Sequence, residues 1–283
     1  MDNKRLVQYR EFTFHLSKEN RLSTSPQALK FIDERGFVFF WPIKGIHYPS
    51  LWTAVAGDRP VPNNHDDPAH ITWRWKDEAL GRRIWYYAKV LRHKATFISL
   101  GVLPYFYALS SNFGSPGEDY LIDFENGNLT LIEKQIFETI MKNGPMHTIE
   151  LRRSLSLSEK RHDHLFNRGM GQLQSDFRIL PIGIAEAGTW KYSFIYDLTH
   201  RHFPQLVEEA HLVSEMDARR KLVELFFLSM GCSKAGDIQR MFQWRIDVIH
   251  RVLDDLVKRG TLIPEERSSE KSSIDYWISE LKN

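Results

Sequence analysis

The clearest pattern of apolar and polar positions lies in the middle of the chain. Ile132, Ile136 and Ile140 recur at the spacing of one helix face. The segment 130–133, Thr-Leu-Ile-Glu, has the form of a capping box and predicts the first turn of this helix. Gly144 and Pro145 then predict its end. We therefore expect an amphipathic helix that begins at the capping box and stops at the glycine.

Two more helices and a hairpin are predicted directly after it. Thr148 opens a short helix to residue 155, and Ser158 caps a third helix that runs to about residue 175. Apolar runs over 179–184 and 190–196 predict two strands joined by a turn at 185–189. Three helices followed by a hairpin is the order of a winged helix.

The same order returns at the C-terminal end. Amphipathic helices are predicted over residues 215–230, 233–242 and 245–258. Apolar runs at 261–264 and 274–277 can pair as strands across the polar wing 265–273. The two units begin about 85 residues apart, which is too far for a short solenoid repeat. They look like two copies of one module.

The region before residue 115 carries weaker signs of the same order. Ser25 can cap a helix that has Pro26 in its first turn, and Gly36 predicts its end. The rest is predicted as a buried strand, a short helix, a proline-rich loop and a hairpin, over residues 37–43, 48–55, 57–69 and 85–100. We interpret this region as a third, degenerate copy with an inserted loop.

These patterns together predict a mainly α (α+β) fold of tandem winged-helix modules with small β-hairpin wings. The expected organisation is a degenerate winged-helix-like module, an acidic linker, a second winged helix and a third winged helix, over residues 1–115, 116–128, 129–204 and 205–283.

Composition narrows the class of protein. Hydrophobic residues make up 42% and charged residues 26% of the 283 residues, as in folded globular chains. A net charge of +2 excludes a uniformly basic nucleic-acid coat, so any basic surface must be local. The single cysteine, Cys232, cannot form an intramolecular disulfide, and its apolar surroundings favour an inert thiol over a catalytic one. No run approaches the ~18 apolar residues of a membrane span, and the polar residues 1–10 predict no signal peptide. We therefore expect a cytoplasmic protein without membrane contact.

The second module contains one candidate surface for duplex DNA. In a winged helix the third helix typically enters the major groove, while the second helix and the wing touch the backbone. The cations and histidines on these two helices are Arg152, Arg153, Lys160, Arg161, His162, His164 and Arg168. Such groups neutralise phosphates and release counterions. The alternative interpretation is an ordinary solvated helix face.

The stretch from Trp73 to Lys94 is a second candidate. Its charged residues are Arg74, Lys76, Arg82, Arg83, Lys89, Arg92 and Lys94 against Asp77 and Glu78, which gives +5. Interleaved with them are Trp73, Trp75, Trp85, Tyr86 and Tyr87. Cations with aromatic rings suit phosphate contact combined with base stacking. The alternative is that the aromatic rings belong to the core and the cations cover it.

Two stretches resemble the AlkZ/YcaQ-type DNA glycosylases. The C-terminal unit, with 218–222 (Ala-Arg-Arg-Lys-Leu), Gly231, Asp237 and Trp244, is similar to the closing winged helix of that family. The segment 93–97 (His-Lys-Ala-Thr-Phe), followed by Leu-Pro, resembles its His-Glu-Ala stretch, with lysine in place of glutamate. The resemblance spans about residues 26–262. It implies an AlkZ-related protein that acts on duplex DNA.

The sequence departs from that family at the expected catalytic positions. The family excises alkylated bases with a Gln-x-Gln or Gln-x-Asp motif just before a proline. If Pro42 matches that proline, Phe39 and Trp41 occupy the two polar positions, and neither ring can orient a water. We also expect no counterpart of the family's C-terminal β-barrel. We assign no catalytic residue, and we expect Phe39, Trp41 and His93 to face a base.

Several other residue patterns are weaker. Gln172 and Gln174 match Gln-x-Gln by text, but they end the third helix of the second module, where amides are usually structural. A loop cluster and a histidine pair could hold a metal by residue type, at His65, Asp66, Asp67 and His70, and at His200 and His202. Neither has a spacing that fixes ligands, so no metal is expected. No phosphate loop or Rossmann fingerprint occurs, so no cofactor is expected.

Three hypotheses follow. The first is a duplex-DNA-binding protein that recognises damaged or flipped bases without the excision chemistry of the family. The second is an active glycosylase with relocated catalytic residues. The third is a winged-helix scaffold for other proteins. Binding to duplex DNA separates the third from the others, and base release separates the first two.

Overall fold

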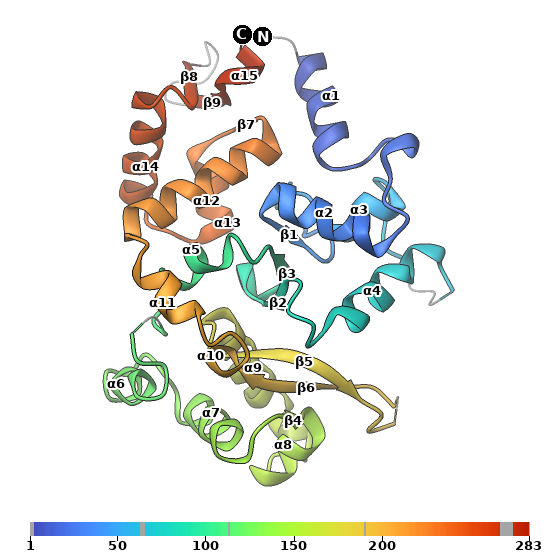
Figure 1. The fold of residues 1–283 in the computed structure, drawn as a ribbon, viewed down its shortest axis with the longest axis vertical. Coiled ribbons are helices and arrows are strands. Elements are labelled where there is room, and N and C mark those ends of the chain that lie inside the picture. Colours follow the sequence, from blue (N-terminus) through green and yellow to red (C-terminus); the bar gives the residue numbers. More distant parts are fainter. Residues whose placement is uncertain (1–2, 63–65, 113, 190, 267–273, 283) are drawn as a thin grey trace.

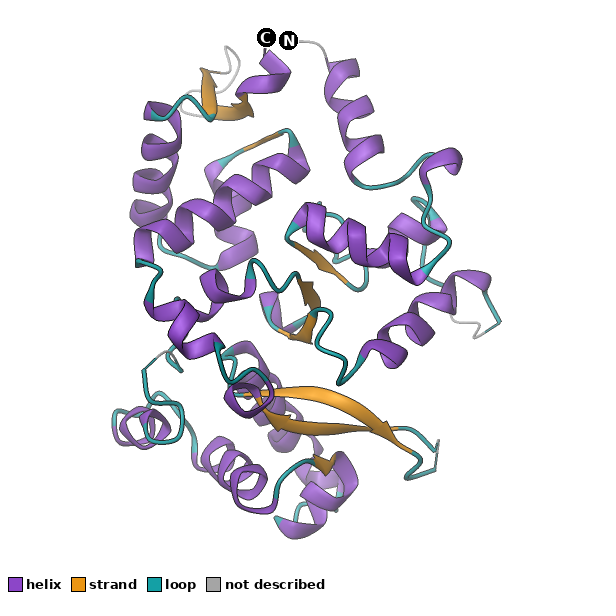
Figure 2. Ribbon diagram, in the orientation of Figure 1, coloured by secondary structure: helices purple, strands orange, loops and turns teal. Residues whose placement is uncertain are grey.

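The computed structural model describes residues 3–62, 66–112, 114–189, 191–266 and 274–282. Its elements fall into three groups that follow one another along the chain, and both ends of the chain lie at the same end of the molecule (Figure 1). Helices make up most of each group, and the strands form small sheets between them (Figure 2). Among the described residues, no helix is long and apolar enough to cross a bilayer.

Each group has the same order of elements. The first module comprises α2 (Ser25–Arg35), β1 (Phe37–Phe39), α3 (Leu51–Ala56), α4 (Ile71–Ala79), β2 (Tyr86–Lys89) and β3 (Ala95–Ile98). The second comprises α7 (Leu131–Asn143), β4 (Met146–His147), α8 (Thr148–Ser154), α9 (Asp163–Ser175), β5 (Ile179–Ala185) and β6 (Ser193–Leu198). The third comprises α12 (Glu215–Met230), β7 (Cys232–Ser233), α13 (Ala235–Phe242), α14 (Ile246–Lys258), β8 (Leu262–Glu266) and β9 (Ile274–Ile278).

The three sheets have one topology. In each, the short strand after the first helix pairs with the last strand, which pairs with the middle one, in the orders β1-β3-β2, β4-β6-β5 and β7-β9-β8. All of these pairings are antiparallel. The prediction of a mainly α fold of tandem winged helices is therefore confirmed, and the first region has the same strand order as the other two.

Local sequence accounts for several helix boundaries. Thr130 caps α7 through a complete capping box with Glu133, as predicted. Helix α12 has the predicted bounds, and Gly231 ends it at a φ of 72°. At α2 the cap is Thr24 rather than Ser25, because the side chain of Gln27 closes a capping box with Thr24.

Other boundaries differ from the prediction. Helix α9 begins at Asp163, after a single 3-10 turn at Lys160–His162, and not at Ser158. The expected strand over 37–43 is the three-residue β1, because the backbone of Phe39 and Phe40 then pairs with the segment 49–52. Residue Trp190, expected to begin a strand, and most of the wing 265–273 lie outside the described residues.

Further short helices complete the chain and were not predicted. They are α1 (Asn3–Thr13), α5 (Leu103–Tyr107), α6 (Asp119–Glu125), α10 (Thr199–His202), α11 (Leu206–His211) and α15 (Ser279–Lys282). Helix α6 lies inside the expected acidic linker. Its Tyr120 is buried, with the ring 4.9 Å from that of Phe137. Part of this segment therefore packs with the core of the second module.

The first and third modules share a hydrophobic core. The ring of Phe37 stacks on Tyr48, and Tyr48 stacks on Phe226 of α12 with 5.5 Å between ring centroids. The hydroxyl of Tyr48 donates to Ser229. The second module has a separate core around Phe137 and Phe166. Phe177 and Leu180, which follow α9, nevertheless belong to the core that the other two modules share. A polar attachment lies in the same segment.

A buried arginine forms that attachment. Arg178 follows α9 and is fully buried. It donates to Oδ1 of Asn112, to Ser111 and, as an ion pair, to Asp123 of α6. Asn112, also fully buried, donates in turn to the carbonyl of Phe177. One side chain thus connects the end of the first module, the linker and the second module.

We predict that Arg178→Met lowers the free energy of unfolding by about 3–5 kcal/mol, because it leaves the Asp123 carboxylate without its partner. Urea unfolding followed by circular dichroism measures the change. The matched control is Lys30→Gln, which breaks an exposed pair with Glu34 and should cost less than about 1 kcal/mol. Equal losses of unfolding free energy in the two variants would contradict the stabilising role of the Arg178–Asp123 pair.

Candidate nucleic-acid interface

The cations predicted on the second module do not share one environment. Arg153, Lys160 and Arg168 are exposed, as is His164. Arg161 is exposed and pairs with Glu159 at 3.0 Å. His162 is half-buried. The exposed members come from α8, from α9 and from the 3-10 turn between them. In a winged helix, the second and third helices are the ones that face DNA.

Arg152 has a structural environment instead. Its side chain is 16% exposed, and its guanidinium donates to Asp163 at 2.8 Å and to Asn167 at 3.1 Å. It also lies 4.1 Å from the centroid of the Phe166 ring. These contacts fasten α8 to the first half of α9. The sequence could not separate Arg152 from its neighbour Arg153, because both are arginines on one short helix.

The segment 89–94, which we name the basic turn, joins β2 to β3. Arg92 and His93 both adopt left-handed backbone conformations, with φ of 57° and 54°. Two successive non-glycine residues in this region are uncommon, because Cβ crowds the backbone there. The side chains of Lys89, Arg92, His93 and Lys94 are exposed. The sharp turn thus presents four basic side chains in six residues.

The basic turn packs against α9 and joins the two sets of cations. Nδ1 of His93 lies 3.5 Å from the carbonyl oxygen of Gly171, and Ser175 donates to the carbonyl of Val90 at 3.2 Å. Gly171 and Ser175 share a helix face with His164 and Arg168, at successive spacings of three and four residues. Side chains of this face therefore continue into the basic turn. We call the exposed basic residues of these elements together the basic strip: Arg153, Lys160, His164 and Arg168 with Lys89, Arg92, His93 and Lys94.

Arg82 and Arg83 lie apart from the strip. They are exposed and precede β2, whereas Lys89 ends it. The charge of Arg83 helps to lower the pKa of His202 on α10, after burial, which is the larger cause. Gly81 supports this turn at a φ of 78°, where a Cβ would meet the carbonyl oxygen of Ile182 at 2.8 Å. The sequence analysis placed these arginines in one candidate surface with the basic turn, but strand β2 lies between Arg83 and that turn.

Most aromatic residues between 73 and 94 belong to the core. Trp75, Trp85 and Tyr86 are buried, whereas Trp73 is 39% exposed. The expectation of base stacking by this whole set is wrong for the buried rings. Trp75 and Trp85 belong to the core of the first module, and Tyr86 packs against Phe177 and Phe203. A helical or strand period alone does not show which side of an aromatic-rich element is covered.

Lys76 is also internal, although the sequence counted it as a surface cation. Its Nζ donates to the hydroxyl of Tyr192 at 2.7 Å and lies 2.6 Å from Asp77. The rings of Trp73 and Phe194 are near the same ammonium, at 5.0 and 4.5 Å. Burial lowers its pKa against the pull of Asp77. Lys76 therefore ties α4 to the hairpin of the second module.

The expected base-facing residues also separate. Phe39 is 1% exposed and packs beside Tyr48 in the core shared by the first and third modules. It cannot face a base, which corrects the expectation for this residue. Trp41 is half-buried on the other side, near Trp52 and Trp73. His93 is exposed on the basic turn.

The two glutamines of the Gln-x-Gln lookalike have structural partners. Gln174 is buried, donates to the carbonyl of Met170 and accepts from the backbone N–H of Lys89. Gln172 donates its amide to both carboxylate oxygens of Asp176, at 2.9 Å each. Neither arrangement leaves a free amide to position a water.

The residues considered for metal binding have other contacts where the structure describes them. Asp67 caps a 3-10 helix and pairs with Arg59 at 2.6 Å. The ring of His70 lies against Trp52, and His65 lies outside the described residues. Burial lowers the pKa of His200 and of His202. Within the described ranges, no three His, Cys, Asp or Glu side chains are grouped to hold a metal.

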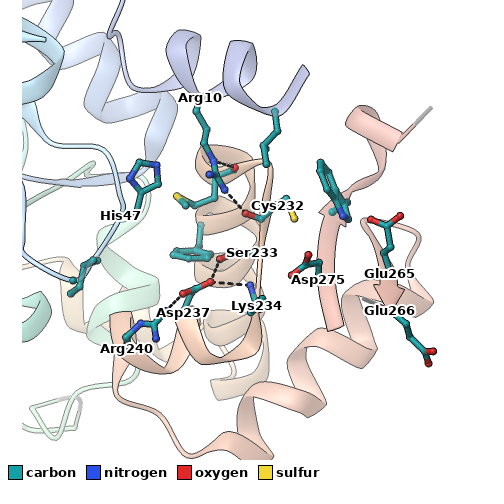
Figure 3. Close-up of a pocket in the computed structure, with 16 residues that line it drawn as sticks. Arg10, His47, Cys232, Ser233, Lys234, Asp237, Arg240, Glu265, Glu266 and Asp275 are labelled. Carbon is teal, nitrogen blue, oxygen red and sulfur yellow. Dashed lines mark hydrogen bonds and ion pairs between the residues drawn. The ribbon is translucent and has the colours of Figure 1, made fainter. Parts of the chain in front are cut away.

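A large open pocket lies between the two ends of the chain. Its volume is about 930 Å³, and its walls come from α1, the turn at 45–47, the end of α12, α13 and the hairpin β8–β9 (Figure 3). Arg10 reaches from α1 to the carbonyls of Met230 and Cys232, at 2.9 and 2.8 Å. Sequence reasoning missed this pocket because no local pattern links residues so far apart along the chain.

The charges of this pocket do not favour phosphate. Its carboxylates, Asp237, Glu265, Glu266 and Asp275, outnumber the cations Arg10, Lys234 and Arg240. Asp237 accepts from Ser233 and from the backbone N–H of Lys234, and it pairs with Arg240 (Figure 3). The carboxylates near β8 and β9 would repel a nucleic-acid backbone. The basic strip is therefore the better candidate for phosphate contact.

Comparison with known proteins shows which family has this architecture. A sequence model of the AlkZ-related family matches residues 22–243. The structure is similar to the DNA glycosylase AlkZ of Streptomyces sahachiroi, with a TM-score of 0.58, 11% sequence identity, and coverage of 98% of this chain and 69% of that one. No curated protein matches the chain by sequence. The fold and the extent of the family match agree, and this chain belongs to the AlkZ-related family.

Proposed function

We propose that this protein binds duplex DNA along the basic strip and recognises damaged or displaced bases without the excision chemistry named for its structural relative. The observation that carries the proposal is the contact between α9 and the basic turn. It connects the helix face of His164 and Arg168 to the exposed cations of the basic turn, although the bonded residues are 78 and 85 positions apart in sequence.

The docking geometry follows from the module type. Helix α9 is the third helix of a winged helix, the one that typically enters the major groove. Arg168 and His164 lie on the face that leads to the basic turn, so cations flank the same groove from two modules. Phosphate contacts of this kind supply affinity with little sequence preference.

The residues at positions 39 and 41 argue against base excision by this protein. Hydrolysis of a glycosidic bond needs a group that orients or activates water near the sugar. Phe39 is packed in the core, and the half-buried Trp41 has no oxygen to offer. Recognition by stacking needs no such group, so a binding function survives the loss of the polar pair.

The first prediction is that binding to a short duplex weakens steeply with salt. For about five phosphate contacts we expect affinity to fall about 100-fold or more between 50 and 200 mM salt, because counterion release drives binding. Fluorescence anisotropy with a labelled duplex measures this. A Kd that stays constant over the range would contradict an electrostatic interface.

The second prediction locates the interface. Arg153→Ala, Lys160→Ala and Arg168→Ala together should weaken duplex binding at least tenfold and lower the salt slope by about one for each cation removed. Arg152 is kept because it fastens α8 to α9. The control carries Lys18→Ala, Lys142→Ala and Lys258→Ala, three exposed lysines on other elements. If both triple variants lose affinity equally, total charge rather than the strip determines binding.

The third prediction concerns excision. We expect no release of N-alkylated purines from duplex DNA above background in single-turnover assays with excess protein, followed by alkaline cleavage of abasic sites. Strand cleavage that depends on the protein would support the alternative of an active glycosylase. Loss of that cleavage in a Gln172→Ala/Gln174→Ala variant would then assign it to the second module.

A further inference from the structure

The three modules have an equivalent helix in third place, α4, α9 and α14. The arginines of these helices differ in their contacts. In α4, Arg74 pairs with Glu78, and in α14, Arg251 pairs with Asp247. Arg168 of α9, by contrast, makes no hydrogen bond or ion pair within the described parts of the chain. Its guanidinium is therefore available to a ligand, whereas carboxylates of the same helix neutralise the other two.

The first half of α9 is held in place before any ligand binds. Asp163 and Asn167 both accept from the guanidinium of Arg152 on α8, at 2.8 and 3.1 Å. Phe166, between them, is fully buried, with its ring 4.1 Å from the same guanidinium. These contacts occupy two polar side chains of the helix and fix the direction of the rest. A surface fixed in this way loses little conformational entropy on binding.

Leu165 lies on the part of α9 that remains free. Its exposed fraction is 46%, and it is not among the residues of the second module's core. His164 precedes it, and Arg168 follows it by three positions, the spacing at which helix side chains are neighbours. One apolar side chain therefore stands beside basic groups on the surface that we propose for DNA.

This combination matches the edge of one base. In helix-turn-helix modules, residues near the N-terminus of the recognition helix contact base edges in the major groove. Thymine presents there an acceptor, O4, and an apolar group, the 5-methyl. Leu165 can cover the methyl group, and Arg168 can donate to O4. Cytosine presents an amine donor and no methyl group, and an arginine has no acceptor for that amine.

We propose that Leu165 contacts the 5-methyl group of thymine in the major groove and gives the protein a preference for thymine within the duplexes that it binds. The inference rests on the proposed function, because it requires α9 to meet duplex DNA. Phosphate contacts from Arg153 and Lys160 supply affinity without sequence information, and Leu165 adds a contact that depends on the base.

The first experiment removes the methyl group from the DNA and leaves the protein unchanged. Fluorescence anisotropy compares a short duplex made only of A·T pairs with the same duplex in which uracil replaces every thymine. Base pairing is the same in both, and each register of the first duplex offers thymine. We expect the uracil duplex to bind about three- to fivefold more weakly, the size of effect expected for one methyl group removed from water.

The second experiment assigns this preference to a residue. Leu165→Ala should weaken binding of the thymine duplex to the level of the uracil duplex, so that the preference disappears. The matched control is Leu121→Ala, the same change on a leucine of α6 that is 40% exposed, and it should keep the full preference. Thermal unfolding checks that both variants are folded, as expected for alanine at exposed helix positions.

The third experiment tests the position of Leu165 in the complex. A duplex carries one pyrimidine with a disulfide-terminated tether at C5, the atom that bears the methyl group in thymine. The thiol of Leu165→Cys should exchange with this disulfide and link the protein to the DNA. Leu121→Cys should not link, and neither should wild type, whose Cys232 is buried. Denaturing electrophoresis without reductant detects the product.

The outcomes separate this inference from the proposed function. A thymine preference that Leu165→Ala abolishes, with cross-linking by Leu165→Cys alone, supports the inference. Equal binding of the two duplexes by wild type overturns it and leaves the proposed function standing. A preference that persists in Leu165→Ala, or equal cross-linking by both cysteine variants, overturns the assignment to Leu165. Absence of binding to either duplex overturns both proposals.

Discussion

The burial of the Arg178 guanidinium is the constraint on which the arrangement of modules depends. A desolvated cation must be paired and hydrogen-bonded, and no single module supplies all of its acceptors. Asp123 comes from the linker and Asn112 from the end of the first module. Because the charge is satisfied only when these segments meet, the second module is held in one position relative to the first. The shared aromatic core then fixes the third module on the first.

This constraint also positions the proposed binding surface. Arg178 lies three residues after the end of α9, so its anchoring fixes that end of the helix beside the basic turn. Ser175 and Gln174 then bond to the backbone of residues 90 and 89. The same contact aligns the exposed face of α9 with the turn. Interdomain packing and the proposed recognition thus use the same few residues.

The sequence predicted the repeated architecture because helix periods, caps and turn residues are local signals. Thr130 and Glu133 predicted the start of α7, and the apolar stripe predicted the first and last residues of α12. Burial in three dimensions was not predictable in the same way. Lys76 looked like a surface cation, yet its partner Tyr192 is 116 residues away. The strip and the pocket between the chain ends likewise combine segments that no period or motif relates, so only the folded chain brings them together.

If Pro42 matches the proline of the family's motif, position 39 exchanges chemistry for packing. A buried amide there would need hydrogen-bond partners, and leaving it unsatisfied costs about 1–3 kcal/mol. Phenylalanine removes that cost and adds an aromatic contact to Tyr48, which stacks on Phe226 of the third module. The residue that would have oriented water now helps to join two modules. Restoring an amide at this position alone would therefore weaken the shared core before it could create an active site, because it would remove the aromatic contact with Tyr48.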